Sequence, residues 1–411
     1  MNRFERKTMK PLQTISNLND FMTEPVSFLQ EVASEGPIKV SYLGPKRFIF
    51  IFDADLAHEV LVKKAPIYIQ NRTVFDRIKP VTGKRGLVQL EGKDSQMARA
   101  TSRPMFSTNS LESARAIVEK YCDEMLVETA ASSNFDVTEK MTYLILRTTL
   151  AILLGMETTE LVDQMGKKFL RLNYLCGLRM RSLAPAPLFI PTSRNREIKQ
   201  LQSEIRNLIK HQLVLVKVRG VAEAFRGDDA LVDHCMTFLF AGHETTAASI
   251  AFALLLLAKN PSYQDTVARG NNEAVEAIYK ESLRLFPPAY MLAREAKKDD
   301  IIGGVNIRKS DQVIIGISSL HKNPLYFDEP EKFYPERFLQ KLKHPFCFIP
   351  FGAGGKSCVG ERLAYMEAVI ILKKICQRYH LSAVSESILY DPLITLHPLP
   401  EQLIQLRERK S

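Results

Sequence analysis

Phe351-Gly-Ala-Gly-Gly-Lys-Ser-Cys358-Val-Gly360 sets one cysteine among four glycines, directly before a segment with a helical pattern. Glycine adopts positive φ readily and lets the backbone approach other groups closely, so this stretch predicts a tight loop. A cysteine at the start of a helix meets free N–H groups and the positive end of the helix dipole. The sequence therefore predicts a loop that presents the Cys358 side chain as a thiolate.

A thiolate in a glycine loop, covered by Phe351, is typical of an axial ligand to haem iron. The alternative is a buried cysteine after a glycine turn, since buried thiols are common. The other five cysteines form no C-x-x-C pair and no regular spacing, which argues against a zinc site or disulfides and for a reducing compartment. They are Cys122, Cys176, Cys235, Cys347 and Cys376.

The composition indicates a large folded protein. The chain has 411 residues, 45% of them hydrophobic, and a formal net charge of +10. We find no Gly/Ser linker, low-complexity tract or internal repeat, so residues 1–411 are predicted to form a single domain. The positive residues are spread along the chain, so they are only a weak sign of a nucleic-acid-binding surface. An acidic protein partner explains them equally well. Residues 1–24 hold no apolar run, so we expect no signal peptide, no transmembrane anchor and a cytoplasmic protein.

The hydrophobic patterns predict a mainly α protein with a minor β part. The β-rich portion is expected mainly at 37–70 and 295–320, and the helical portion mainly at 94–290 and 358–380. Helices are predicted at 25–36, 53–64, 111–129, 137–154, 159–175, 193–219, 230–259, 272–286 and 361–379. Strands are predicted at 38–43, 47–52, 300–307 and 311–317, with short strands in the tail to Leu406. Residues 70–90 and 170–192 are expected to be irregular and to shape a ligand pocket.

Two apolar stretches raise the question of a membrane. Residues 247–258 are too short to span a bilayer and continue a helix that carries charged residues, so a buried core helix is the better interpretation. Residues 182–192 form a proline-rich apolar loop, which is unusual because loops normally face water. This loop either lines a ligand entrance, contacts a lipid surface or packs on its neighbours.

The middle of the helix at 230–259 reads Ala241-Gly-His-Glu-Thr-Thr246. An acid beside an alcohol in a buried helix is costly unless it is used or paired. Gly242 leaves room beside the backbone for a small ligand, to which Thr245 would donate a hydrogen bond while Glu244 relays a proton. Taken alone, an ordinary polar patch on a helix explains these residues as well.

Glu281 and Arg284 share one face of the helix at 272–286, because they are three residues apart. Their helix end is otherwise apolar, so the pair is predicted to be buried. Arg337 lies in a later aromatic and proline-rich stretch, and its guanidinium fork suits a third position in a carboxylate–guanidinium triad.

In this order, these motifs resemble the cytochrome P450 family of haem-thiolate monooxygenases. The resemblance covers nearly the whole chain and is clearest from residue 230 to 368. It implies the P450 fold, a large helical haem-binding domain with small sheets, and haem b (iron protoporphyrin IX) as cofactor. It also implies that Cys358 is the proximal ligand to iron.

The resemblance implies further roles for residues that match the family motifs. Glu244 and Thr245 match the acid–alcohol pair that activates oxygen, and Glu281, Arg284 and Arg337 match a structural triad. Haem contacts are implied for Arg99, Arg294, Lys356 and Phe351. Ala241, Tyr290, Met291 and Leu292 fall where the family lines its substrate pocket.

Two positions depart from the family pattern. Lys356 stands where the family usually has Arg or His, and lysine reaches a propionate as a point charge rather than as a fork. Ser95 stands where Trp or His is usual. One haem propionate is therefore expected to be held less tightly, while neither change touches the oxygen chemistry.

The implied reaction is insertion of one oxygen atom from O2 into a hydrophobic small molecule, such as a fatty acid, terpenoid or steroid. The chain has no flavin or iron–sulfur module, so electrons are expected from a ferredoxin or flavodoxin with its NAD(P)H reductase. Three alternatives remain: a haem-thiolate peroxygenase or isomerase, a non-enzymatic haem sensor, and a helical scaffold without cofactor. The pair Glu244 and Thr245 favours the monooxygenase over the first two.

Overall fold

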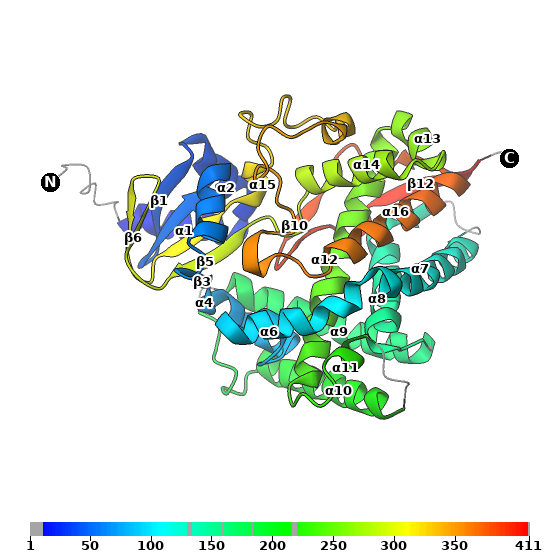
Figure 1. Cartoon of the computed structure of the whole chain (residues 1–411), viewed down its shortest axis with the longest axis horizontal. Coiled ribbons are helices and arrows are strands. Elements are labelled where there is room, and N and C mark those ends of the chain that lie inside the picture. Colours follow the sequence, from blue (N-terminus) through cyan, green and yellow to red (C-terminus); the bar gives the residue numbers. More distant parts are fainter. Residues whose placement is uncertain (1–10, 130–133, 158, 183, 216–219, 410–411) are drawn as a thin grey trace.

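The structure is a computed structural model that describes residues 11–129, 134–157, 159–182, 184–215 and 220–409. Helix α12 (Leu231–Lys259) runs through the middle of the helical part, and the sheet-rich part lies to one side (Figure 1). Most residues of α12 are buried on all sides, which explains why its sequence is apolar around the whole helix. The helices that surround α12 are α7 (Thr108–Thr129), α8 (Val137–Leu154), α9 (Thr159–Arg181), α10 (Ser193–Leu215), α14 (Asn272–Leu285) and α16 (Glu361–Arg378).

The largest sheet has five strands in the order β1-β2-β8-β5-β3. Its members are β1 (Ile38–Leu43), β2 (Lys46–Ile51), β8 (Gln312–Ile315), β5 (Leu292–Ala296) and β3 (Tyr68–Gln70). Strands β2 and β8 are parallel and the other neighbours are antiparallel. Two N-terminal helices, α1 (Pro11–Thr23) and α2 (Pro25–Ser34), lie beside this sheet (Figure 1). Aromatic side chains from α1, α2 and β2, including Phe21, Phe28 and Phe50, pack together between them.

Smaller sheets complete the β part. Strands β9 (Tyr379–Ala383), β12 (Leu403–Glu408) and β4 (Asn134–Asp136) form one of them, and β10 (Tyr390–Pro392) pairs with β11 (Leu396–Pro398). Strands β6 (Asp300–Ile302) and β7 (Val305–Ile307) form a hairpin whose turn residues Gly303 and Gly304 both have positive φ. Shorter helical segments link the main elements: α3 (Ala54–His58), η1 (Glu59–Lys63), α4 (Arg72–Phe75), η2 (Asp76–Ile78), α5 (Lys79–Thr82), η3 (Leu87–Gln89), α6 (Gly92–Ser102), η4 (Arg103–Phe106), α11 (Gly220–Ala224), α13 (Ser262–Ala268), α15 (Ile317–Leu320), η5 (Pro335–Leu339) and η6 (Gly354–Lys356).

The predicted mainly α class with a minor β part is confirmed. The predicted helix at 137–154 agrees with α8 at both ends, and Asp53 caps α3 by accepting a hydrogen bond from the Leu56 N–H. Three expectations were wrong. Helix α9 continues to Arg181, so residues 170–181 are helical rather than irregular; residues 72–82 and 87–89 form short helical turns; and α1 was not predicted.

Two findings bear on the membrane question. Among the described helices, α12 is the one long and apolar enough to cross a bilayer, and 72% of its most apolar window is buried inside the fold, as in the core helix of a globular protein. The apolar loop that follows α9 is held by polar contacts: Arg179 donates to the Ala186 carbonyl, and Asn195 donates to the carbonyls of Pro187 and Ile190. Its Phe189 side chain is 79% exposed.

Candidate active site

The glycine loop closes tightly around Cys358. The Cys358 N–H donates to the Phe351 carbonyl oxygen at 2.8 Å, which ties the two ends of the loop together. Gly354 has φ of 69°, and a Cβ at this position would lie 2.3 Å from the Leu61 carbonyl oxygen. No other residue type fits there without a shift of the backbone. The Phe351 ring packs beside Tyr365 of α16, with ring centroids 5.3 Å apart.

Cys358 differs from the other cysteines in exposure. All six cysteines lie in the described part of the chain, and Cys358 is the one that is exposed. Dense surroundings nevertheless desolvate its sulfur and raise the pKa of the thiol, while the N–H groups of Gly360 and Glu361 at the start of α16 act in the opposite direction. The start of the helix therefore lowers the pKa of the Cys358 thiol, as the sequence predicts, but burial raises this pKa by more. A thiol placed in this way loses its proton when it binds a metal ion.

Three cationic side chains converge near the loop, and each donates to a backbone carbonyl. Arg99 of α6 donates to the Ser357 carbonyl oxygen at 2.6 Å, and its Nε is buried without a partner among the described residues. Arg294 of β5 donates to the Ala293 carbonyl oxygen at 3.0 Å, and burial together with the charge of Arg99 lowers its pKa to about 10, although Glu91 opposes this shift.

The third cation, Lys356, makes an ion pair with Glu91 at 3.3 Å and donates to the Leu90 carbonyl. Burial lowers the pKa of Lys356, and the charges of Arg99 and Arg294 lower it further against the opposing effect of Glu91. One carboxylate thus faces three cations, which leaves an excess positive charge of about two. The two propionates of haem b match this excess, and a ligand with this charge would stabilise side chains that repel one another. The residues present therefore fit haem b.

Helix α12 presents Thr245 and Glu244 on neighbouring faces, about 100° apart. The Thr245 hydroxyl donates to the Ala241 carbonyl oxygen at 2.8 Å, one turn earlier. Glu244 accepts a hydrogen bond of 2.6 Å from the Asn173 side chain of α9. Burial raises the pKa of Glu244, and the Asn173 hydrogen bond, the charge of His397 and the Thr395 hydroxyl act against that rise. The two residues of the acid–alcohol pair therefore have different hydrogen-bond partners.

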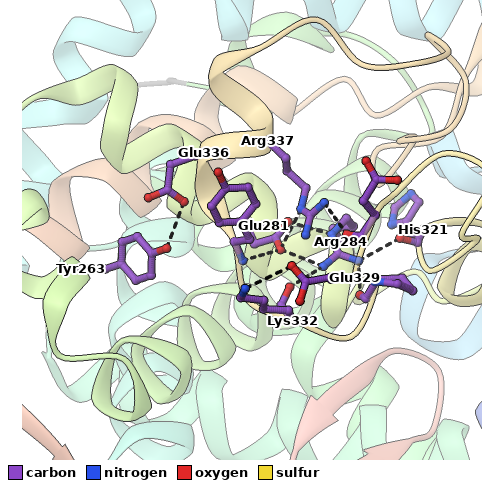
Figure 2. A network of polar contacts seen from close by, with 11 residues as sticks. Tyr263, Glu281, Arg284, His321, Glu329, Lys332, Glu336 and Arg337 are labelled. Atoms are coloured by element: carbon purple, nitrogen blue, oxygen red, sulfur yellow. Dashed lines mark hydrogen bonds and ion pairs between the residues drawn. The ribbon is translucent and has the colours of Figure 1, made fainter.

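Figure 2 shows Glu281, Arg284 and Arg337 in one polar network. The Glu281 carboxylate accepts from Arg284 Nε at 2.7 Å and Nη2 at 2.8 Å, from Arg337 Nε at 3.2 Å and from the Tyr334 N–H at 2.8 Å. Glu281 and Arg284 are completely buried. The structure thus brings together the three residues that the sequence predicts as a triad, although 53 residues separate Arg284 from Arg337.

The network continues toward the cysteine loop. Arg284 donates to the His321 carbonyl oxygen at 3.1 Å, and the His321 ring accepts from the Ile349 N–H at 3.0 Å. Ile349 in turn accepts from the Gly352 N–H at 3.0 Å, at the start of the loop. This continuous path gives the triad a physical means of positioning the residues that carry Cys358.

A cavity of about 320 Å³ lies between the large sheet, α1 and the end of α9. Tyr290 and Met291 line it, and their place in a substrate pocket stays a prediction. Leu292 does not line this cavity; its side chain lies near Gly352 of the cysteine loop. Ala241 is also outside this lining, on an exposed part of α12.

Sequence reasoning missed two partners in the site. Glu91, the carboxylate beside Lys356, comes just before α6, and its position next to the helix of Arg99 was a usable signal. Asn173, the partner of Glu244, lies 71 residues away on α9, and its sequence neighbourhood gives no sign of the contact.

A mainly α fold in which a glycine loop holds one exposed cysteine beside a cluster of cations defines a haem-thiolate protein. Comparison with known proteins agrees. The family model for cytochrome P450 matches residues 8–218 and 226–405, so the chain belongs to the cytochrome P450 family. It is a P450 monooxygenase, and its cofactor is haem b.

Relatives and solved structures span most of the chain. A cytokinin hydroxylase of Arabidopsis thaliana is 28% identical, over 89% of this chain and 80% of that protein. The cyclooctat-9-en-7-ol 5-monooxygenase of Streptomyces melanosporofaciens is 26% identical, over 88% of this chain and 86% of that protein. The crystal structure of CYP175A1 from Thermus thermophilus superposes with a TM-score of 0.82 at 23% identity, over 96% of this chain and 98% of that one, and confirms the fold.

Proposed function

We propose that this protein hydroxylates a hydrophobic small molecule with one oxygen atom of O2, using electrons from a ferredoxin or flavodoxin and its NAD(P)H reductase. The observation that carries the proposal is the exposed Cys358 thiol beside three cations and one carboxylate. Bound haem supplies oxygen activation and the attack on the C–H bond. Both relatives reported above carry hydroxylase or monooxygenase names, which supports this reaction type.

The residues of the chain divide the remaining work. Cys358 would hold the haem iron, Phe351 would cover its loop, and Arg99, Arg294 and Lys356 would hold the propionates. On α12, the Thr245 hydroxyl donates its proton to the Ala241 carbonyl, so its oxygen would be left to accept a hydrogen bond from water beside the haem, and Glu244 would pass protons toward that water. Burial raises the pKa of Glu244 and so favours its protonated form, which suits a group that holds and gives a proton.

The cavity beside Tyr290 and the surface beside the cysteine loop support the substrate and the partner that we propose. The 320 Å³ cavity beside Tyr290 and Met291 is lined mainly by apolar side chains, which supports a hydrophobic substrate. Lys280 lines a surface hollow together with Phe351 and Gly352, so a positive group stands next to the cysteine loop. An acidic electron-transfer protein suits this position. We place the protein in the cytoplasm, consistent with the burial of α12.

The test is the spectrum of the reduced, CO-bound protein. Thiolate ligation gives a red-shifted Soret band, which we expect in the wild type and in Cys347→Ala but not in Cys358→Ala. Cys347 is the matched control because it is completely buried near the same loop. A band that survives in Cys358→Ala and disappears in Cys347→Ala would refute the assignment. Product analysis with hydrophobic ligands that change the ferric spectrum then tests hydroxylation itself.

A further inference from the structure

A cavity of about 160 Å³ lies along α12 on the side of Glu244. Its walls come from α8, α9, α12 and the segment around β11. Glu244 of α12, Asn173 of α9 and His397 of β11 all line it. A water molecule occupies about 30 Å³ in the liquid, so the cavity has room for several.

Polar atoms without protein partners indicate that water fills this cavity. The Asn173 Oδ1 and the His243 Nδ1 are buried and have no hydrogen-bond partner in the described part of the chain, and both residues line the cavity. Buried polar atoms in native proteins are satisfied by ordered water where the protein offers no partner.

Four titratable side chains line the cavity, and they differ in what they can do. From α12 come Glu244 and His243, from α9 comes Tyr174, and from β11 comes His397. Burial lowers the pKa of His243 to about 4, so this imidazole is neutral at physiological pH. Histidine is the side chain that exchanges protons in this range.

His397 is placed to connect solvent with the cavity. Its side chain is partly exposed, whereas His243 is buried. The His397 Nδ1 lies 3.2 Å from the Thr395 carbonyl oxygen. If Nδ1 donates its proton there, Nε2 is left for exchange with water.

We propose that this cavity is the proton entrance of the enzyme and that His397 supplies protons through its water to Glu244. The inference rests on the proposed function, in which Glu244 feeds the oxygen chemistry. In each transfer the His397 imidazolium loses one proton to cavity water, that water passes one proton to the Glu244 carboxylate, and bulk solvent reprotonates the neutral imidazole. The external redox partner supplies the electrons, so the relay moves protons only.

Turnover gives the first test. We compare wild type, His397→Gln and Tyr174→Phe, a control that changes another wall residue without removing a neutral-pH proton carrier. His397→Gln should keep the CO spectrum and substrate affinity, lower product formed per NAD(P)H by about three- to tenfold, and increase the solvent deuterium isotope effect. Tyr174→Phe should behave as the wild type. Unchanged coupling and isotope effect in His397→Gln would overturn the proposal.

A second test does not need turnover. In the diamagnetic, CO-bound ferrous protein, NMR of labelled histidines gives the titration of His397, with the resonance assigned through His397→Gln. Because coupling between titrating sites is reciprocal, Glu244→Gln should lower the pKa of His397. An identical His397 titration in both proteins would also overturn the proposal. Failure of the proposed function is seen separately, as an absent red-shifted band or no hydroxylated product in the wild type.

Discussion

Replacement of Arg284 by alanine should remove much of the stability of the haem-binding fold. The Arg284 guanidinium makes five hydrogen bonds: two to the Glu281 carboxylate and three to the carbonyl oxygens of His321, Pro330 and Lys332, at 3.1, 2.6 and 3.1 Å. Its side chain is completely buried, so water does not replace these contacts in the variant.

The stability lost in Arg284→Ala depends on the buried groups that are left without a partner. Removing one partner of a buried ion pair costs about 3–5 kcal/mol, because the other charge stays buried. Three carbonyl oxygens also lose a donor, and each buried unsatisfied group costs about 1–3 kcal/mol. Since a folded protein is stable by only about 5–15 kcal/mol, Arg284→Ala should leave little folded, haem-loaded protein.

Arg337→Ala is the matched control. Arg337 makes one hydrogen bond to Glu281, at 3.2 Å, and its side chain is slightly exposed. We therefore expect a loss of about 1–3 kcal/mol and a protein that still binds haem. Haem content per chain and the urea midpoint, measured for both variants and the wild type, test this order. An Arg284→Ala protein with full haem content and the wild-type midpoint would show that the buried network does not support the fold.

Further predictions concern protons, haem and pH. Thr245→Ala should leave the CO spectrum unchanged and lower product per NAD(P)H, because it removes a hydroxyl that is held by the Ala241 carbonyl and would order water for proton delivery, while the buried Thr246→Ala should change coupling much less. Lys356→Arg should slow haem transfer to apomyoglobin, because a guanidinium fork holds a propionate better than a point charge. Burial raises the pKa of Glu367 from 4.5 to about 8, so the folded protein keeps a proton that the unfolded chain has lost. Between these pH values the wild type should lose stability relative to Glu367→Gln, by at most about 5 kcal/mol in urea unfolding.

Helix positions were predictable where local signals are strong. The ends of α8 follow from the capping Asp136 and from Gly155, which takes a left-handed conformation just after the helix. The end of α9 was not predictable in this way: the sequence predicts a helix that ends at residue 175, before Gly177, whereas α9 continues to Arg181. In the structure this glycine is helical, and it lies where a Cβ would meet the Leu393 side chain at 3.4 Å. The helix continues through Gly177 because its last turns are buried in the fold, which the local sequence does not show.

The same distinction holds for the site. The cysteine loop is local, so its sequence predicts a tight turn and a presented thiol. The position of Arg294, in contrast, depends on distant residues. It lies on strand β5, which pairs with β8 on one side and with β3 on the other. The resemblance to a family indicated Arg294, whereas its charge balance with Glu91, Arg99 and Lys356 emerged only from the fold.

The geometry of α12 explains why the acid and the alcohol have different neighbours. Adjacent helix positions are about 100° apart, so Thr245 and Glu244 face different surroundings. Glu244 turns toward α9 and the 160 Å³ cavity that His397 also lines. Lys280 and the cysteine loop share a hollow with α16 residue Glu361 and lie outside that cavity's lining. Protons and electrons would then enter through different elements of the fold, so a variant on either route should slow one supply while leaving the other intact.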